Sequence, residues 1–330
     1  MRRTVSAVSV LACLLVSAAY AQSALRPIDI KEWPVPWENT RPRDPFPDAR
    51  GRVWFVGQQG NYIAYLEPVS GEFKRYEIEK GTHPHNLIVD ARGVWYAGNR
   101  NARIGKLDPE TGNLTIFPMP DPAARDPHTL TFDKHGDIWF TAQGSNFVGK
   151  LDTKSGQIRL IRPPVQRGLP YGIVVDPEGR PWVDLFGANK LGRIDPATMQ
   201  MRTIDLPRED ARPRRIVATS DGMIWYVDYA GGMLGRLNPK TGQIKEWSSP
   251  RGAQSRPYAM AMDDKDRIWY VETGVRPNKF VGFDPAREAF FSITDIPSGG
   301  GSVRHMMFDA RTRLIWFGTD AGTIGRAVIP

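Results

Sequence analysis

Seven tryptophans recur along the 330-residue chain at intervals of 41 to 47 residues. Each stands in a short run of aromatic and β-branched residues such as VWF, IWF or IWY. A period in the low forties, with turn residues between strand-like runs, is typical of a β-propeller with one blade per repeat. We therefore expect an all-β chain folded as a seven-bladed β-propeller. The repeating residues are Trp54, Trp95, Trp139, Trp182, Trp225, Trp269 and Trp316.

The third repeat indicates how one blade is built. Four short β-rich runs at about residues 129–132, 138–141, 147–151 and 157–161 alternate with clusters of Gly, Asp and Asn, as in an antiparallel meander. The last repeat has only three such runs before the chain stops. Residues 28–36 resemble a fourth strand, so we expect this N-terminal strand to complete the last blade and remove its free edge.

The first residues have the features of a secretory signal peptide. Arg2 and Arg3 precede a mostly apolar run at 5–16, and Ala19-Tyr20-Ala21 fits a cleavage site. We expect residues 1–21 to be removed and residues 22–330 to form one propeller domain in a secreted, periplasmic protein. A retained membrane anchor is the alternative, but the apolar run is short for a span. Cys13 is the single cysteine, so the mature chain would contain no disulfide.

The charge pattern favours a small ligand over a nucleic acid. The formal net charge is +8, and the basic residues are scattered without a run of five or more like charges. Such scattering argues against nucleic-acid binding and for local anion sites. Residues 22–330 contain no segment suited to span a membrane, and we expect a monomer.

Propeller topology predicts which side chains meet. In a four-stranded meander the innermost strand lines the central channel, so the residues that open these strands converge at one end of it. All seven can donate hydrogen bonds and three are permanent cations, which suits a small-molecule or peptide-like anionic ligand. Plugging of the channel by these side chains is the alternative. Six of the seven follow a proline, and they are Arg43, His85, His128, Tyr171, Arg214, Tyr258 and Arg304.

Histidines are the candidates for catalysis. His85 and His128 hold equivalent positions in adjacent blades, His83 adds a third imidazole, and Asp126 precedes His128 by two residues. A pair of imidazoles with a nearby carboxylate can act as a general base with its orienting group. We therefore predict His85, Asp126 and His128 as catalytic residues and His83 as a ligand contact. His305 follows its ring position by one residue, so strand alternation predicts that it points away from the channel.

Two acidic residues are candidates for a metal site. Asp228 and Glu272 each lie three residues after their repeat tryptophan, at the same end of neighbouring blades. Converging carboxylates could bind a hard cation such as Mg²⁺. Salt bridges to Arg214 or Arg256 are the alternative for these two acids.

The phrases IWFT, GKLDPETG, TIFPMP and PHTLTFD resemble the repeats of the virginiamycin B lyase (streptogramin B lyase) family. The resemblance covers about residues 28–330. It implies a seven-bladed propeller that opens a cyclic depsipeptide antibiotic at its ester by elimination with magnesium. It also implies that His128 is the base, with His85 beside it and Asp126 as a nearby acid. The family's glutamate after the tryptophan run of that blade has no counterpart at Ala142 or Gln143.

Two functions remain open from the sequence. The first is a lyase-like enzyme acting on an anion, ester or lactone held in the central funnel. The second is a non-catalytic periplasmic propeller that binds a ligand or an interaction partner. No cofactor is certain, and magnesium is expected only if acidic ligands reach the histidines.

Overall fold

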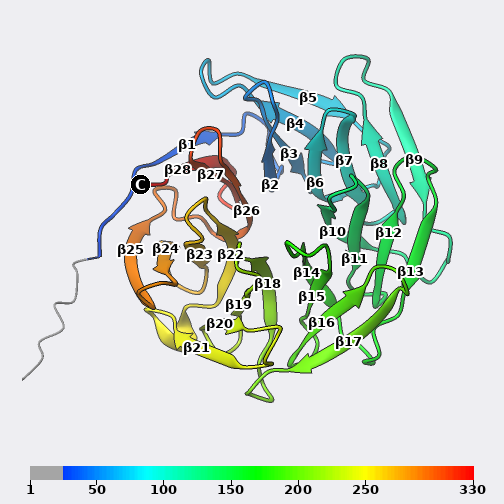
Figure 1. The fold of residues 1–330 in the computed structure, drawn as a ribbon. Helices are drawn as coiled ribbons and strands as arrows, with labels where there is room; N and C mark the ends of the chain where they lie inside the picture. The colour runs from blue at the N-terminus through cyan, green and yellow to red at the C-terminus, as the bar shows by residue number, and fades with distance from the viewer. Residues whose placement is uncertain (1–24) are drawn as a thin grey trace, which may run out of the picture.

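The computed structural model describes residues 25–330, so the predicted signal peptide lies outside the described residues. Seven four-stranded antiparallel sheets surround a central axis like the blades of a propeller (Figure 1). The predicted all-β fold and number of blades are confirmed. Apart from a 3₁₀ turn at Gly252–Gln254, these residues form no helix. No helix among them is long and apolar enough to cross a membrane.

The innermost strand of each blade borders the axis and contacts its counterparts in the neighbouring blades. These strands are β2 (Pro42–Pro47), β6 (Pro84–Asp90), β10 (Pro127–Phe132), β14 (Pro170–Val175), β18 (Pro213–Ala218), β22 (Pro257–Met262) and β26 (Val303–Asp309).

Each repeat tryptophan stands on the second strand of its blade. These strands are β3 (Val53–Gly57), β7 (Gly93–Gly98), β11 (Ile138–Ala142), β15 (Pro181–Leu185), β19 (Ile224–Asp228), β23 (Ile268–Glu272) and β27 (Leu314–Thr319).

The third and fourth strands lie progressively further from the axis (Figure 1). The third strands are β4 (Tyr62–Leu66), β8 (Arg103–Leu107), β12 (Phe147–Leu151), β16 (Lys190–Asp195), β20 (Met233–Leu237), β24 (Lys279–Asp284) and β28 (Thr323–Val328). The fourth strands are β5 (Phe73–Glu77), β9 (Leu114–Pro118), β13 (Ile158–Ile161), β17 (Gln200–Asp205), β21 (Ile244–Ser248), β25 (Ala289–Asp295) and β1 (Ile30–Pro34).

The N-terminal strand closes the ring as predicted. β1 pairs with β28 along its whole length, from Ile30 opposite Ala327 to Pro34 opposite Thr323. Trp33 of β1 also stacks on Trp316 of the last blade, with ring centroids 5.8 Å apart. The two ends of the chain therefore form one sheet, and the outer side of β28 is paired instead of being left as a free edge.

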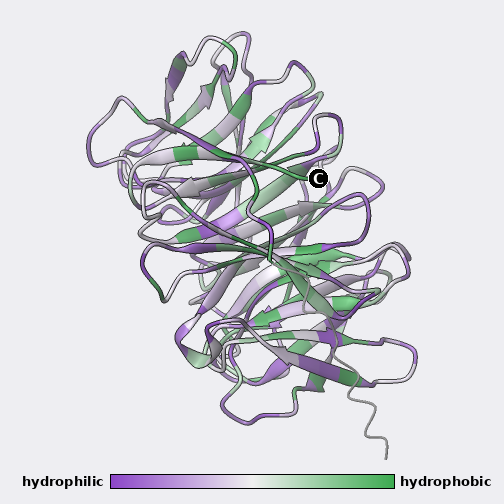
Figure 2. Cartoon of the chain, turned by 90° about the vertical axis from the view of Figure 1, so that its left-hand side faces the viewer, coloured by the Kyte–Doolittle hydropathy of each residue, from purple (hydrophilic) through white to green (hydrophobic). Residues whose placement is uncertain are grey.

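The tryptophans pack between neighbouring blades, as the repeat predicts. Trp95 of the second blade belongs to the same apolar cluster as Leu130 and Phe140 of the third. Trp225 contacts Phe283 of the following blade, with centroids 5.7 Å apart. Figure 2 shows apolar colour concentrated on the strands and hydrophilic colour on many of the loops. Burial of large aromatic surfaces between blades is the main source of stability in such a fold.

Five of these tryptophans also bind an aspartate in the turn before their strand. The indole Nε1 of Trp182 donates to Asp176 at 2.9 Å, and Arg180 Nε donates to the same carboxylate at 2.8 Å. The same indole–aspartate bond recurs at Trp54, Trp95, Trp139 and Trp269. We call the face that carries these turns the turn face, and the opposite face the funnel face.

Candidate functional site: the channel mouth

A break in strand pairing shapes the channel mouth in every blade. On β10, Pro127 pairs with Ala142, but the next paired residue is Leu130, opposite Phe140. His128 and Thr129 therefore share a single partner, Thr141, which is a β-bulge. Corresponding shifts follow the start of the other six innermost strands. A bulge turns two successive side chains toward the axis, whereas a regular strand would turn one.

The structure brings all seven predicted ring residues together, and we call this set the mouth ring. The rings of His85 and His128 pack against each other at a tilt of 36°, with centroids 3.5 Å apart, and the centroid of His128 lies 4.2 Å from that of Tyr171. The Tyr171 hydroxyl hydrogen-bonds the Tyr258 hydroxyl. The Tyr258 ring lies 3.8 Å from Arg214 Cζ and 5.9 Å from Arg304 Cζ. Arg43 completes the set, close enough to influence the ionisation of both tyrosines.

Both stacked histidines are neutral at physiological pH. Burial and then the positive charge of Arg43 lower the pKa of His85 well below its usual value. Burial and then Arg215 do the same to the pKa of His128. The Nδ1 of His128 lies 2.9 Å from Thr129 Oγ1. A neutral imidazole can accept a proton, but at this lowered pKa it is a weak base.

The expectation that Asp126 orients His128 is wrong. The Asp126 carboxylate accepts hydrogen bonds from the amides of Gly144 and Ser145 and from the Ser145 hydroxyl. Asp126 therefore fixes the loop between β11 and β12, and Thr129 is the partner of the imidazole instead. The short side chain of an aspartate readily accepts hydrogen bonds from nearby loop amides. These bonds compete with a contact to the more distant imidazole of His128.

His83 lies on the rim, outside the histidine stack. Its Nδ1 is 3.2 Å from the carbonyl oxygen of Gln58, and its amide donates to Asn61 Oδ1 at 2.8 Å. The side chain of Gln58 in turn accepts from Arg43 Nη1 at 3.0 Å. His83 thus joins the loops of the first two blades next to the mouth ring.

Beneath the mouth ring lies a second layer of polar side chains that the sequence reasoning missed. Arg215 Nε donates to the Arg304 carbonyl at 2.9 Å, and its Nη1 donates to Thr129 Oγ1 at 3.1 Å. Asn86 donates to Asp44 Oδ2 at 2.9 Å, and Arg43 Nε donates to Asp44 Oδ1 at 3.0 Å. Each of these residues comes one position after a residue of the mouth ring. The sequence shows this spacing, but regular strand alternation predicts that such residues point away from the channel.

The expectation that His305 points away from the channel is also wrong. Burial lowers the pKa of His305 to about 4, and the neighbouring charges of Arg215, Asp44 and Arg43 act on it as well. His305 therefore belongs to the second layer, because the bulge on β26 between Val303 and Met306 reverses the alternation. Burial alone would raise the pKa of Asp44, but Arg43, His305, Arg215 and the hydrogen bond from Asn86 together outweigh burial and hold the pKa well below its usual range.

The predicted metal ligands have other partners. The Asp228 carboxylate forms an ion pair with Arg208 and accepts from the Arg212 amide at 2.7 Å and the Ala230 amide at 3.1 Å. Its partner is thus Arg208, rather than Arg214 or Arg256. Glu272 accepts from the Arg251 amide at 3.0 Å. Within residues 25–330, no group of three or more His, Cys, Asp or Glu is placed to hold a metal. Asp228 is engaged by Arg208 and Glu272 by a backbone amide, so these carboxylates do not fit a magnesium site.

Charge at the channel mouth is poorly compensated. Arg43, Arg214, Arg215 and Arg304 gather there, whereas Asp44 and Asp320 are the acids that pair with them. Asp184 lies nearby on β15, but burial raises its pKa well above the usual value, so it adds no negative charge. Several buried nitrogen atoms at the mouth have no hydrogen-bond partner among the described residues: Arg43 Nη2, Arg215 Nη2, Arg214 Nε, His85 Nδ1 and His305 Nδ1.

The fold and this mouth define a seven-bladed propeller with a positively charged central site. The chain belongs to the Virginiamycin B lyase family, whose model matches residues 28–327. The comparison with curated protein sequences found no match.

Solved structures agree with this assignment. A streptogramin B lyase superposes with a TM-score of 0.81 at 26% identity, covering 91% of this chain and 97% of that one. A catalytically inactive His-to-Ala virginiamycin B lyase from Staphylococcus aureus with quinupristin gives 0.82 at 24% identity, covering 92% and 100%. The extracellular domain of a hybrid two component system from B. thetaiotaomicron gives 0.69 at 18% identity, covering 92% of this chain and 43% of that one.

Proposed function

We propose that this protein is a secreted, periplasmic propeller that binds a small anionic ligand at the channel mouth. The ligand class is a carboxylate, or an ester or lactone whose carbonyl oxygens can accept several hydrogen bonds. Binding needs no metal in this proposal, because guanidinium and imidazole groups supply the positive charge and the donors. The signal-peptide pattern at residues 1–21 supports the location.

The observation that carries the proposal is the set of buried donors without acceptors. A buried N–H left unpaired costs about 1–3 kcal/mol, and more when the group is charged. Three guanidinium N–H groups of this kind, from Arg43, Arg214 and Arg215, gather around one axis, and the Nδ1 atoms of His85 and His305 also have no partner there. An anion placed among them would satisfy several donors and offset the excess positive charge. Arginine is well suited to this, because its planar fork can bind both oxygens of a carboxylate.

Calorimetric titration of the purified protein with succinate, acetate and sulfate, and with methyl acetate as the neutral comparison, tests the proposal. The anions should bind more tightly than the neutral ester. Arg215→Met should weaken anion binding at least tenfold. Arg50→Met is the matched control, because Arg50 is exposed on the turn face and pairs with Glu110 at 2.8 Å. Equal weak binding of all four probes, or no effect of Arg215→Met, would refute the anion site.

Elimination on such a ligand is the second candidate. The neutral stacked imidazoles of His85 and His128 favour it, and one structural neighbour is described as inactive after a His-to-Ala change. In this reaction a base removes a proton from the carbon next to the carbonyl. The electron pair forms a C=C bond, and the alkyl C–O bond breaks with loss of a carboxylate.

Incubation with quinupristin, followed by chromatography and mass spectrometry, tests this candidate. Elimination opens the ring without a change in mass, whereas hydrolysis adds one water. If His128 is the base, His128→Ala should slow the chemical step by roughly 10² to 10⁴. Arg214→Ala should act mainly on binding. An unchanged rate in His128→Ala would exclude His128 as the base, and an unchanged retention time would leave binding as the function.

A further inference from the structure

Two tyrosines from different blades meet at the mouth. Tyr171 of β14 and Tyr258 of β22 belong to the fourth and sixth blades, and their hydroxyl groups hydrogen-bond each other. Both side chains are almost fully buried. One hydroxyl donates and the other accepts, so a single proton lies between two phenol oxygens and one proton remains that can be released.

Cations surround this pair from several elements. Arg214 lies between the two tyrosines in the ring, with Cζ 3.8 Å from the Tyr258 ring and 5.2 Å from the Tyr171 ring. Arg215 lies 5.2 Å from Tyr171 on the side of the second layer. The charged and titratable groups around the pair are Arg43 of β2 with its partner Asp44, His128 of β10, Arg214 and Arg215 of β18, Tyr229 after β19, and Arg304 of β26 with its partner Asp320.

We propose that the Tyr171–Tyr258 pair is the acid–base group of the channel mouth, and that an anionic ligand binds together with a proton taken up by this pair. When the pair loses its free proton, the resulting phenolate is a negative charge held by Arg214 and Arg304. A ligand carboxylate would compete for the same cations. The site therefore has two favourable states. In one the tyrosine pair carries a phenolate and no anion is bound, and in the other the pair is protonated and an anionic ligand is bound.

The electrostatics agree with the geometry. Burial alone raises the pKa of Tyr258, but Arg214, Arg43, Arg215 and Arg304 together outweigh burial and lower it to about 8. Burial, followed by the charge on Tyr258, raises the pKa of Tyr171, so the second proton stays between the two oxygens. The histidines next to the pair are held neutral far below this range. The tyrosine pair is thus the group at the mouth that exchanges a proton close to neutral pH.

Absorbance at 295 nm, which reports tyrosinate, tests the first half of the proposal without any ligand. The protein should form one tyrosinate with a midpoint near pH 8, and Tyr258→Phe should abolish this step. Tyr171→Phe should raise the midpoint by about one pH unit, because the phenolate loses a hydrogen bond from the Tyr171 hydroxyl. Tyr76→Phe is the control, since its hydroxyl donates to Pro109 O on the turn face and should leave the step unchanged.

No tyrosinate below about pH 9.5, or a low step that survives Tyr258→Phe, would overturn the acid–base assignment. Circular dichroism verifies that each variant is folded, and Tyr→Phe retains the buried ring.

The second half rests on the proposed anion site and is tested by adding the anion. Saturating succinate should raise the midpoint by about one unit or more, and calorimetry at pH 8.5 in two buffers of different ionisation heat should show proton uptake. Binding without a shift would overturn the coupling but leave the anion site intact. A low-pH tyrosinate step without any anion binding would overturn the proposed function and the coupling, and would leave the acidity of the pair established.

Discussion

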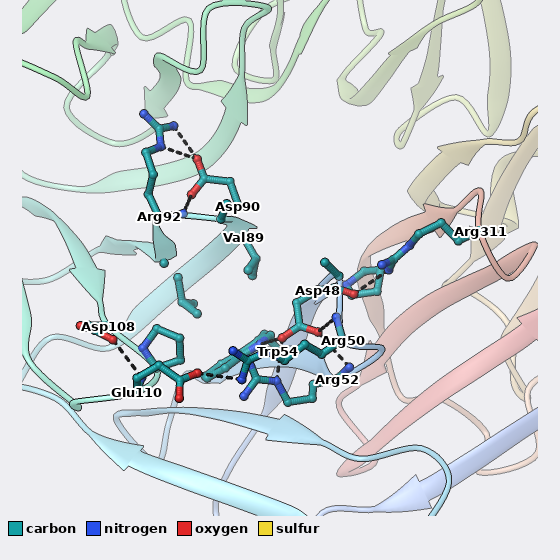
Figure 3. A pocket seen from close by; sticks show the side chains of 16 residues that line it. Asp48, Arg50, Arg52, Trp54, Val89, Asp90, Arg92, Asp108, Glu110 and Arg311 are labelled. Carbon is teal, nitrogen blue, oxygen red and sulfur yellow. Dashed lines mark hydrogen bonds and ion pairs between the residues drawn. The ribbon is translucent and has the colours of Figure 1, made fainter.

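Arginine occurs at both ends of the channel axis, but it is paired very differently at the two faces. On the turn face a groove of about 520 Å³ lies between the first two blades (Figure 3). Arg52 pairs there with Asp48 at 2.7 Å, Arg50 with Glu110 at 2.8 Å, and Arg92 with Asp90. At the channel mouth, by contrast, Arg214 has no acidic partner within residues 25–330, and Arg215 reaches Asp44 only at 3.8 Å.

The arginines of the turn face belong to ion-pair networks within the fold, whereas Arg214 and Arg215 keep buried N–H groups that have no partner among the described residues. On the turn face, the carboxylates of Asp48 and Asp90 also accept hydrogen bonds from an indole or a backbone amide, so these two ion pairs are part of the blade itself. At the mouth, the cations mostly contact aromatic rings and carbonyl oxygens, which do not cancel their charge. The same residue type is therefore paired within the blades at one face and incompletely paired among the described residues at the other; our proposal of an anion site rests on this contrast.

The largest effect is expected from removing a turn-face carboxylate. Asp176→Ala deletes the acceptor of the Trp182 indole, of Arg180 Nε and of two backbone amides. The free energy of unfolding should fall by about 3 kcal/mol, because buried donors are left unpaired. Urea unfolding measures this loss, while the mouth tyrosinate step stays in place. Glu178→Ala in the same turn is the control and should cost about 0.5 kcal/mol or less. Equal effects of the two changes would mean that the turn-face network is not structural.

The histidines of the mouth should make stability depend on pH. His85, His128 and His305 have folded pKa values below the unfolded value of about 6.5. At acid pH the unfolded chain therefore binds more protons than the folded chain. Above pH 6.5 the three histidines are neutral in both states and do not lower the free energy of unfolding. Below pH 6.5 this free energy falls, and His305 alone should account for a loss on the order of 2 kcal/mol by pH 5.

Urea midpoints between pH 7.5 and pH 5 measure this loss. His305→Gln should flatten the profile, whereas His135→Gln should not, because His135 is exposed on the turn face. A profile that is the same in both variants would show that His305 does not contribute.

Neutralising a mouth arginine should weaken binding without weakening the fold. Arg214→Met keeps an unbranched side chain among the rings of Tyr258 and Tyr229 and removes an uncompensated charge. We expect anion affinity to fall about tenfold, or about 1.4 kcal/mol, with an unchanged or higher urea midpoint. Arg180→Met on the turn face is the opposite case and should lower the midpoint with no effect on affinity. Loss of stability in Arg214→Met would erase the distinction between the faces.

The smallest effect concerns a buried acid beside the mouth. In the third blade, Thr141 donates its hydroxyl to the Tyr171 carbonyl at 2.8 Å. Asp184 holds the equivalent position in the fourth blade, and both its oxygens lack a partner among the described residues. Its folded pKa is raised, so its stability contribution is present below about pH 4 and is lost as pH rises.

Asp184→Asn should therefore raise the free energy of unfolding at pH 7 by about 1 kcal/mol, and the gain should vanish at acid pH. Thr141→Val is the matched comparison and should lower the free energy of unfolding, because it removes the hydroxyl at the corresponding position. If Asp184→Asn instead lowers the free energy of unfolding at pH 7, the carboxylate of Asp184 is charged and is stabilised by a partner within the fold.

The sequence alone determined the architecture and the members of the mouth ring. A tryptophan repeat with turn residues between strands permits few folds, and the missing last strand required the N-terminal segment to close the ring. The residue that opens each inner strand could be found because repeats place it at one topological position. These features depend on spacing along the chain, which a sequence displays directly.

Only the tertiary structure decided which of those side chains interact. The bulges that turn Arg215 and His305 toward the axis break the alternation rule, and no residue pattern marks them. Asp126 accepts a hydrogen bond from an amide of the neighbouring loop, and Asp228 pairs with Arg208. Tyr171 hydrogen-bonds Tyr258, although a blade lies between theirs. In each case several partners compete for one side chain, and differences of a few ångströms decide which one binds it. The folded and closed ring sets these distances, and the sequence does not contain them.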